Sequence, residues 1–163
     1  MIGGRDAARA VSEMIERATV QGPGVRIAAS AAARLGSTLS PDASRQLLQH
    51  ADPAVRTVAC CCARPLPQLI LLLIDLLDDL NQGVARSAAC ALGRMGRIEA
   101  RCKLKSLLRD DPSEDVIDAV SLIADEECVV LLGRIARSGT ILAAAALASL
   151  ENIDLPRAGG VRH

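Results

Sequence analysis

The chain repeats one residue pattern about every thirty positions. In the first four repeats, a small or β-branched residue opens a run rich in alanine, and in the first three runs an arginine follows it. A period of this length predicts a stack of similar units, none of which can bury its apolar face alone. The runs begin at Val25, Val55, Ala85, Val116 and near Leu142, so the spacings are 30, 30, 31 and about 26 residues.

A second apolar segment precedes each alanine-rich run, and a turn sequence separates the two. Turn residues such as Asp52 and Ser113 can cap the following helix, because their side-chain oxygens accept its free N–H groups. The unit is therefore a helical hairpin, and five of them are expected in a single domain over residues 1–150, followed by a flexible C-terminal tail over 151–163. The expected repeats lie near residues 5–36, 41–63, 66–96, 98–124 and 126–150.

The composition supports an all-α fold. The chain has 28 Ala and 23 Leu but no Phe, Trp or Tyr. The missing rings disfavour functions that stack bases or flat cofactors on aromatic faces. With 19 basic and 19 acidic residues, no polybasic arm for nucleic acid is expected. The apolar stretch from Leu69 to Ile74 is too short to span a membrane, so we expect a cytoplasmic protein with reduced thiols.

Two segments carry a family resemblance. Asp52-Pro53-Ala54-Val55-Arg56 resembles the turn and the start of the second helix of HEAT-like repeats, especially the short bacterial kind found in phycobilin lyase subunits. The segment from Ala88 to Gly96 resembles the second helix itself. The resemblance covers roughly residues 20 to 152. It implies an α-solenoid that winds as a right-handed superhelix, with the second helices lining a concave groove.

Residues at matching places in the second helices are expected to line up as rows. One row, Arg26, Arg56 and Arg86, is expected to pair with Asp52, Asp79 and Asp111 in a structural ladder between repeats. A second row holds Arg34, Arg64 and Arg94, and Ser30, Cys60 and Cys90 lie between the two rows. The second row and the three residues between the rows are expected to face outward and to bind a partner. Cations at helix C-termini also interact favourably with the helix dipole without any ligand.

The cysteines and acids form no recognisable catalytic or metal-binding motif. Cys60 and Cys90 each have an arginine four residues before and after, which would lower the pKa of an exposed thiol, so these two are the expected reactive cysteines. Cys62 is expected on the buried face. With no CxxC spacing and only His50 within the repeats, neither a metal site, a cofactor nor a catalytic residue is predicted.

The last predicted helix, over residues 141–150, is apolar nearly all round. A terminal repeat should show water a polar face, and this segment holds only one polar residue, Ser149. We therefore expect it to pack against a second copy of the chain, unless the tail folds back over it. The expected dimer contacts are Ile141, Leu142, Leu147 and Leu150.

These features predict a non-catalytic scaffold or adaptor that holds an acidic segment of another protein in the groove. The resemblance to phycobilin lyase subunits implies an alternative, a cofactor-attachment or enzyme-maturation factor that uses a groove cysteine. Nucleic-acid binding is a third reading, which a chain of zero net charge disfavours.

Overall fold

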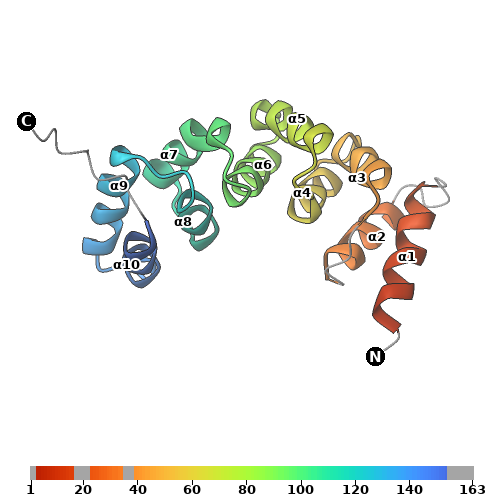
Figure 1. Cartoon of the computed structure of the whole chain (residues 1–163), viewed down its shortest axis with the longest axis horizontal. Coiled ribbons are helices and arrows are strands. Elements are labelled where there is room, and N and C mark those ends of the chain that lie inside the picture. Colours follow the sequence, from red (N-terminus) through yellow and green to blue (C-terminus); the bar gives the residue numbers. More distant parts are fainter. Residues whose placement is uncertain (1–2, 17–22, 35–38, 154–163) are drawn as a thin grey trace, which may run out of the picture. The chain divides into compact units, whose positions relative to one another are not determined.

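The computed structural model describes residues 3–16, 23–34 and 39–153, and every regular element in these ranges is helical (Figure 1). Its helices alternate as the first and second helices of an α-solenoid, and consecutive helices pack together in α1–α2, α3–α4, α7–α8 and α9–α10. The first helices, the A helices, are α1 (Gly3–Glu16), α3 (Pro41–Leu48), α5 (Pro67–Asp75), α7 (Arg101–Asp110) and α9 (Glu126–Arg137). The second, or B, helices are α2 (Pro23–Arg34), α4 (Pro53–Cys62), α6 (Gln82–Arg94), α8 (Glu114–Val120) and α10 (Ala143–Asn152). Short 3₁₀ turns, η1 (Leu76–Asp78) and η2 (Ile98–Ala100), follow α5 and precede α7.

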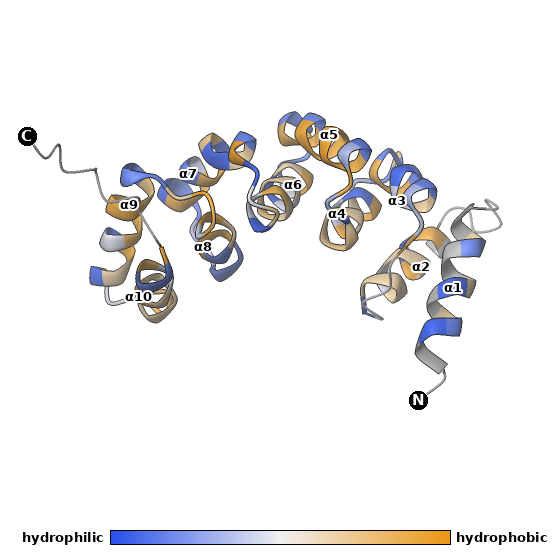
Figure 2. Cartoon of the chain, in the orientation of Figure 1, coloured by the Kyte–Doolittle hydropathy of each residue, from blue (hydrophilic) through white to orange (hydrophobic). Residues whose placement is uncertain are grey.

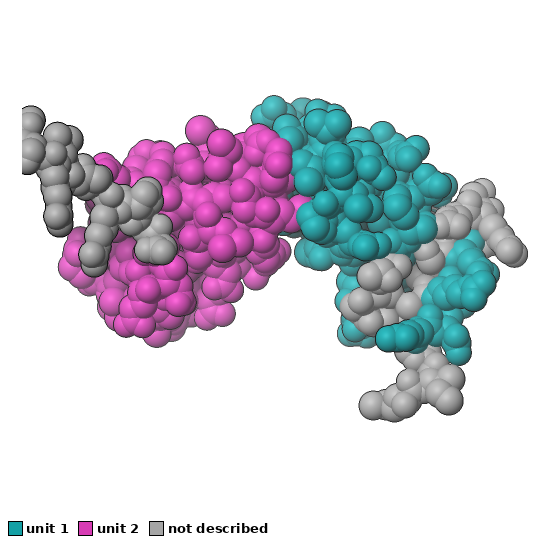
Figure 3. All heavy atoms as spheres, in the orientation of Figure 1, with its two compact units in different colours: residues 1–91 teal, residues 92–163 magenta. Residues whose placement is uncertain are grey.

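The chain forms two compact units, residues 1–91 and 92–163, and the division falls within α6 (Figure 3). In unit 1, the A helices α1, α3 and α5 pack in succession, and α2 packs along α4. In unit 2, α7 packs along α9 and α8 along α10. Each unit therefore has an A layer and a B layer. The single domain over residues 1–150 stays a prediction. Of the predicted tail, Glu151 and Asn152 end α10, and residues 154–163 lie outside the described ranges.

The polar turn residues set where helices begin. Ser40, Asp52, Ser113 and Asp125 are N-caps, and each side chain accepts a hydrogen bond from a backbone N–H of the first turn at 2.9–3.4 Å. Proline supplies a helical φ at the start of α3, α4 and α5. At the other end, Gly96 has a positive φ of 72°, and the Arg97 N–H behind it donates to the Leu92 carbonyl at 2.9 Å.

Leucine, valine and alanine fill both cores in place of aromatic rings. In unit 1, Leu69, Leu73 and Val84 are fully buried, and in unit 2 Leu104 and Leu132 are fully buried. The apolar colouring in Figure 2 is strongest along α5, the A helix with the most leucines. Because alanine has a small side chain, the B helices can approach their neighbours closely, and this compensates for the missing rings.

Within unit 2, α10 is buried on one face only. It buries Ala146 and Ser149, and the Ser149 hydroxyl shares a 2.8 Å hydrogen bond with the hydroxyl of Ser121, which caps the end of α8. Of the expected dimer contacts, Ile141 is 93% exposed and Leu147 53% exposed. Leu142 and Leu150 are half-buried. The dimer through this face stays a prediction.

Candidate functional site

A tie between two repeats is formed by Arg56, in the first turn of α4. Its guanidinium donates to both carboxylate oxygens of Asp79, at 2.9 and 3.0 Å, and Asp79 lies in the turn before α6. It also donates to the carbonyls of His50 and Ala51 at 2.8 and 3.0 Å. The Arg56 hydrogen bond holds the pKa of Asp79 below its ordinary value. The structure contains this contact, one rung of the predicted ladder, and the ladder as a whole stays a prediction.

The other two rungs differ from it. Arg26 is exposed and forms no ion pair with any described residue, while the Asp52 carboxylate caps α4. The expected Arg26–Asp52 rung is therefore absent among the described residues, because the cap already uses that carboxylate. Arg86 and Asp111 belong to different units, and their pairing stays a prediction.

The exposed face of α2 combines cations with apolar surface. Arg26, Ser30 and Arg34 lie four residues apart on it, and Ile27 between them is 72% exposed. Together with Ala31 they line a hollow of about 540 Å³. Neither arginine pairs with a carboxylate of the described residues. An exposed isoleucine between two unpaired guanidinium groups is a surface suited to binding an anionic, partly apolar segment. This set of five residues is called the α2 face below.

Arg64 and Arg94 occupy related places at the ends of later B helices. Arg64 follows α4 and is exposed, with no ion pair among the described residues. Arg94 is the last residue of α6 and lies 3.9 Å from the exposed Asp115, both in unit 2. Arg34 and Arg64 share unit 1, where α2 packs along α4. The row that would join all three arginines stays a prediction.

Comparison with protein-family models matches residues 42–124, half of the chain, to the family described as HEAT repeats. The chain belongs to the HEAT-repeat family. The match runs from α3 through α8, the part of this HEAT-repeat protein where the repeat spacing is most regular. Comparisons with curated proteins and with solved structures gave no match. HEAT repeats indicate a protein-interaction scaffold and are typically non-enzymatic. The narrower resemblance to phycobilin lyase subunits stays a prediction.

The prediction that Cys60 and Cys90 face outward is wrong. In this HEAT-repeat protein Cys60 is 1% exposed and Cys90 is 3% exposed, whereas Cys61 is exposed and Cys62 half-buried. A helical wheel shows one helix alone, but α4 is packed by α3 and by α2, so little of its surface is left exposed. Burial raises the pKa of the Cys60 thiol to about 12 and that of Cys62 to about 11. The Cys60 thiol is therefore unsuited to nucleophilic chemistry, and burial closes Cys90 to solvent.

Thiol labelling of the folded chain should reverse the order expected from the sequence. The exposed Cys61 and Cys102 should react first with a maleimide and the half-buried Cys62 more slowly, because labelling needs a thiol that is open to solvent. Cys60, Cys90 and Cys128 should react only after unfolding. Mass spectrometry of the labelled peptides measures the order, and a urea-unfolded sample is the control in which all six should react. Early labelling of Cys60 would contradict the burial.

A charged cluster missed at the sequence level links α7 to α9. Lys105 donates to Asp125 at 2.7 Å and to Glu127 at 2.8 Å, and Arg109 donates to Glu127 at 3.0 Å. The hydrogen bond to Asp125 raises the pKa of Lys105, and the bond from Lys105 lowers that of Glu127. Burial alone would raise the pKa of Asp125, but the bonds from Lys105 and the Cys128 N–H lower it.

The sequence spacing of the basic residues in α7 could have predicted that they share one helix face. Arg101, Lys105 and Arg109 are spaced four residues apart, which places them on one face of an A helix. They pair with acids of the next A helix and so contribute to cohesion within unit 2 rather than to a basic groove of B helices. Among the described residues, no three His, Cys, Asp or Glu side chains are grouped to hold a metal ion, and no helix is long and apolar enough to cross a membrane.

Proposed function

We propose that this HEAT-repeat protein is a non-catalytic scaffold that binds an acidic segment of a partner protein on the α2 face. The observation that supports the proposal best is the exposed Ile27 between two arginines, Arg26 and Arg34, that pair with no described carboxylate. Most other surface cations of the described chain are already used. Arg45 pairs with Asp42 and Arg9 with Glu13, for example, so their charge is locally balanced.

The spacing of the two arginines restricts the partner. Arg26 and Arg34 are eight residues apart on one helix, which is about 12 Å along its axis. Carboxylates eight positions apart on a partner helix, or about four apart on an extended segment, have the same spacing. An apolar side chain between the two carboxylates would meet Ile27. The expected partner segment therefore carries an apolar side chain between two acidic side chains.

The proposal extends to Arg64, which is exposed at the end of the neighbouring B helix, and to Arg94 as a contact made by unit 2. Ser30 can add a hydroxyl donor between Arg26 and Arg34. Cys60 and Cys90 are removed from the expected binding set because they are buried. Since no aromatic side chain is present, affinity rests on charge and aliphatic contact, and it should fall as salt screens the arginines.

Charge reversal on α2 tests the proposal. The probe is a fluorescein-labelled, alanine-rich helical peptide with two glutamates eight positions apart and one leucine between them. Its affinity, measured by fluorescence anisotropy at low salt, should fall about tenfold or more in the double variant Arg26→Glu/Arg34→Glu, because attraction becomes repulsion. Both side chains are exposed, so the variant should fold normally.

The matched control is Arg9→Glu/Arg45→Glu, which changes the net charge equally at two other exposed arginines of unit 1. If the control weakens binding as much as the α2 variant, only net charge matters and the proposed site is wrong. If a single-stranded oligonucleotide binds the α2 face more tightly than the peptide does, the protein-binding proposal is contradicted in favour of nucleic acid.

A further inference from the structure

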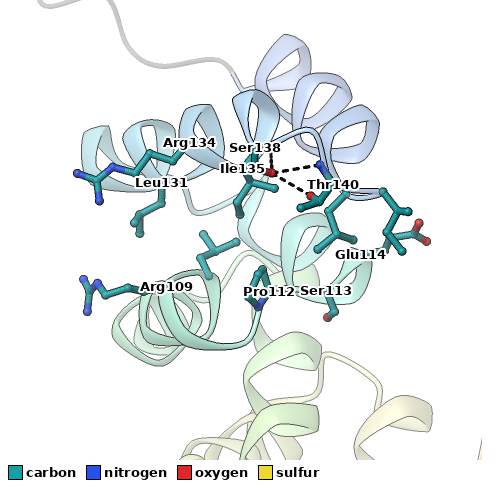
Figure 4. A pocket seen from close by; sticks show the side chains of 12 residues that line it. Arg109, Pro112, Ser113, Glu114, Leu131, Arg134, Ile135, Ser138 and Thr140 are labelled. Atoms are coloured by element: carbon teal, nitrogen blue, oxygen red, sulfur yellow. Dashed lines mark hydrogen bonds between the residues drawn. The ribbon is translucent and has the colours of Figure 1, made fainter.

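Unit 2 contains a cavity of about 630 Å³, and none of its lining residues belongs to the α2 face. It is formed where the end of α7 and the turn into α8 meet the second half of α9 and the turn into α10 (Figure 4). Its volume is within the usual range for ligand-binding pockets. The wall is mainly apolar and is formed by Leu108, Pro112, Leu131, Ile135, Ile141 and Leu142.

The rim of this cavity exposes more apolar surface than the fold requires. Ile141 is 93% exposed although its neighbours in the wall, Leu108 and Ile135, are buried. The turn that carries it is well ordered by its own hydrogen bonds. The Ser138 hydroxyl donates to the Ile135 carbonyl at 2.6 Å and shares a 2.9 Å hydrogen bond with the Thr140 hydroxyl. A firmly held turn thus presents a bulky side chain to solvent beside an apolar hollow, which is typical of an interaction site.

The two ends of the cavity carry opposite charge. Figure 4 shows Arg109 and Arg134 at one end and Glu114 at the other. Arg109 already bonds Glu127 at 3.0 Å, but Arg134 forms no ion pair with a described residue, and neither does Glu114. An occupant is therefore favoured if it has an apolar middle, a carboxylate towards the arginines and a cation towards Glu114.

We propose that this cavity binds a short peptide segment of a partner protein, with bulky apolar residues in the middle, an acidic residue at one end and a basic residue at the other. A fatty acid or similar amphiphile would satisfy the arginines but would leave Glu114 facing its apolar tail. A peptide can satisfy both ends, and its backbone can bond to the polar rim. The site does not depend on the α2 face, which lies in unit 1.

Methyl NMR of the full chain tests the proposal, with isoleucine labels as reporters. The probe is a capped hexapeptide with a lysine at one end, two leucines in the middle and a glutamate at the other end. It should shift the methyl signals of Ile135 and Ile141 but not that of Ile27, which reports on the α2 face. Replacing the glutamate of the probe with lysine should weaken binding about fivefold, because Arg109 and Arg134 then face a cation. Replacing the leucines with serines should abolish the shifts.

Two pairs of variants locate the interaction. Arg134→Glu should weaken binding of the lysine–leucine–glutamate probe about fivefold, whereas Arg137→Glu, on the same helix but outside the wall, should leave it unchanged. Ile141→Gln should weaken it similarly, whereas Leu122→Gln, also exposed in unit 2 at 71%, should not. All four side chains are exposed, so these variants should fold.

Several results would overturn the proposal. If the peptide leaves the Ile135 and Ile141 signals unchanged, the cavity does not bind it. If the peptide with glutamate and the peptide with lysine in its place bind equally well, the cavity has no charge selectivity. Shifts that follow protein concentration without any peptide would assign the cavity to a second copy of the chain. Tighter binding of decanoate than of the peptide would assign it to a lipid. If the peptide with two glutamates does not bind the α2 face, the cavity proposal is unaffected. The two sites are read from different signals, Ile27 for the α2 face and Ile135 and Ile141 for the cavity.

Discussion

Replacing Arg56 with alanine should lower the free energy of unfolding by about 3 kcal/mol or more. The guanidinium joins both oxygens of Asp79 to the His50 and Ala51 carbonyls, and the Arg56 and Asp79 side chains are only 16% and 9% exposed. Removing it leaves a largely buried carboxylate without its cation. Urea unfolding followed by circular dichroism at 222 nm measures the loss, since the chain has no tryptophan or tyrosine for fluorescence.

Two further variants separate geometry from charge. Arg45→Ala breaks the Arg45–Asp42 pair, whose side chains are 51% and 73% exposed, and should cost less than about 1 kcal/mol. Arg56→Lys keeps the charge but loses the bidentate hydrogen bond to Asp79. Its loss of unfolding free energy should therefore lie between those of Arg56→Ala and Arg45→Ala. Equal stability of Arg56→Ala and Arg45→Ala would show that the tie contributes nothing beyond a surface pair.

The same tie has a defined pH dependence. Because the Arg56 hydrogen bond lowers the pKa of Asp79 in the folded chain, ionised Asp79 stabilises the fold at pH values above its unfolded pKa of about 3.9. The contribution is lost as the pH falls through the lowered, folded value. The gap in unfolding free energy between the wild type and Asp79→Asn should therefore be constant near neutral pH and shrink below about pH 4.

Replacing Gly93 with alanine should destabilise unit 2 by about 2 kcal/mol, although alanine normally favours a helix. Gly93 lies in α6, where an added Cβ would collide with the Ala119 carbonyl oxygen of α8 and lie 2.8 Å from the Leu104 Cδ1. The helix or the Ala119 backbone would have to shift. Urea unfolding of the variant, again followed at 222 nm, measures the effect.

Gly133 provides the matched control for this prediction. It is also a helical glycine of unit 2, in α9, but a Cβ there would meet only the Arg137 guanidinium, at 3.5 Å or beyond. Gly133→Ala should therefore stabilise the chain by up to about 1 kcal/mol, because alanine restricts the unfolded backbone more than glycine does. If both substitutions stabilise the chain equally, α6 and α8 do not approach as closely at Gly93 as described.

The repeat pattern predicted several surface arginines of the candidate site, whereas the placement of the cysteines failed because neighbouring helices were not considered. Arg56 and Asp79 were paired correctly because both belong to turn positions that recur with the repeat. Arg34 and Arg64 were correctly expected at the surface, since each lies at the end of a B helix. Cys60 was misplaced because a wheel assigns it a face without showing which neighbouring helix covers that face.

Gly93 illustrates the same limit. It is the last residue but one of α6, near the helix end that the sequence favours, and Gly96 closes the turn behind it. Only the nearness of the α8 backbone explains why a glycine stands there. The cavity of unit 2 also had no sequence signal, since its wall combines residues from two hairpins.

The sequence by itself determined the helical hairpins, their number, their capped starts and the family, because periodicity, turn chemistry and helix propensity act over a few neighbouring residues. The tertiary structure alone decided which faces remain exposed, which ion pairs form between α7 and α9, and where an apolar hollow opens. These features depend on how successive hairpins pack, and packing joins residues twenty or more positions apart whose contacts no local pattern specifies.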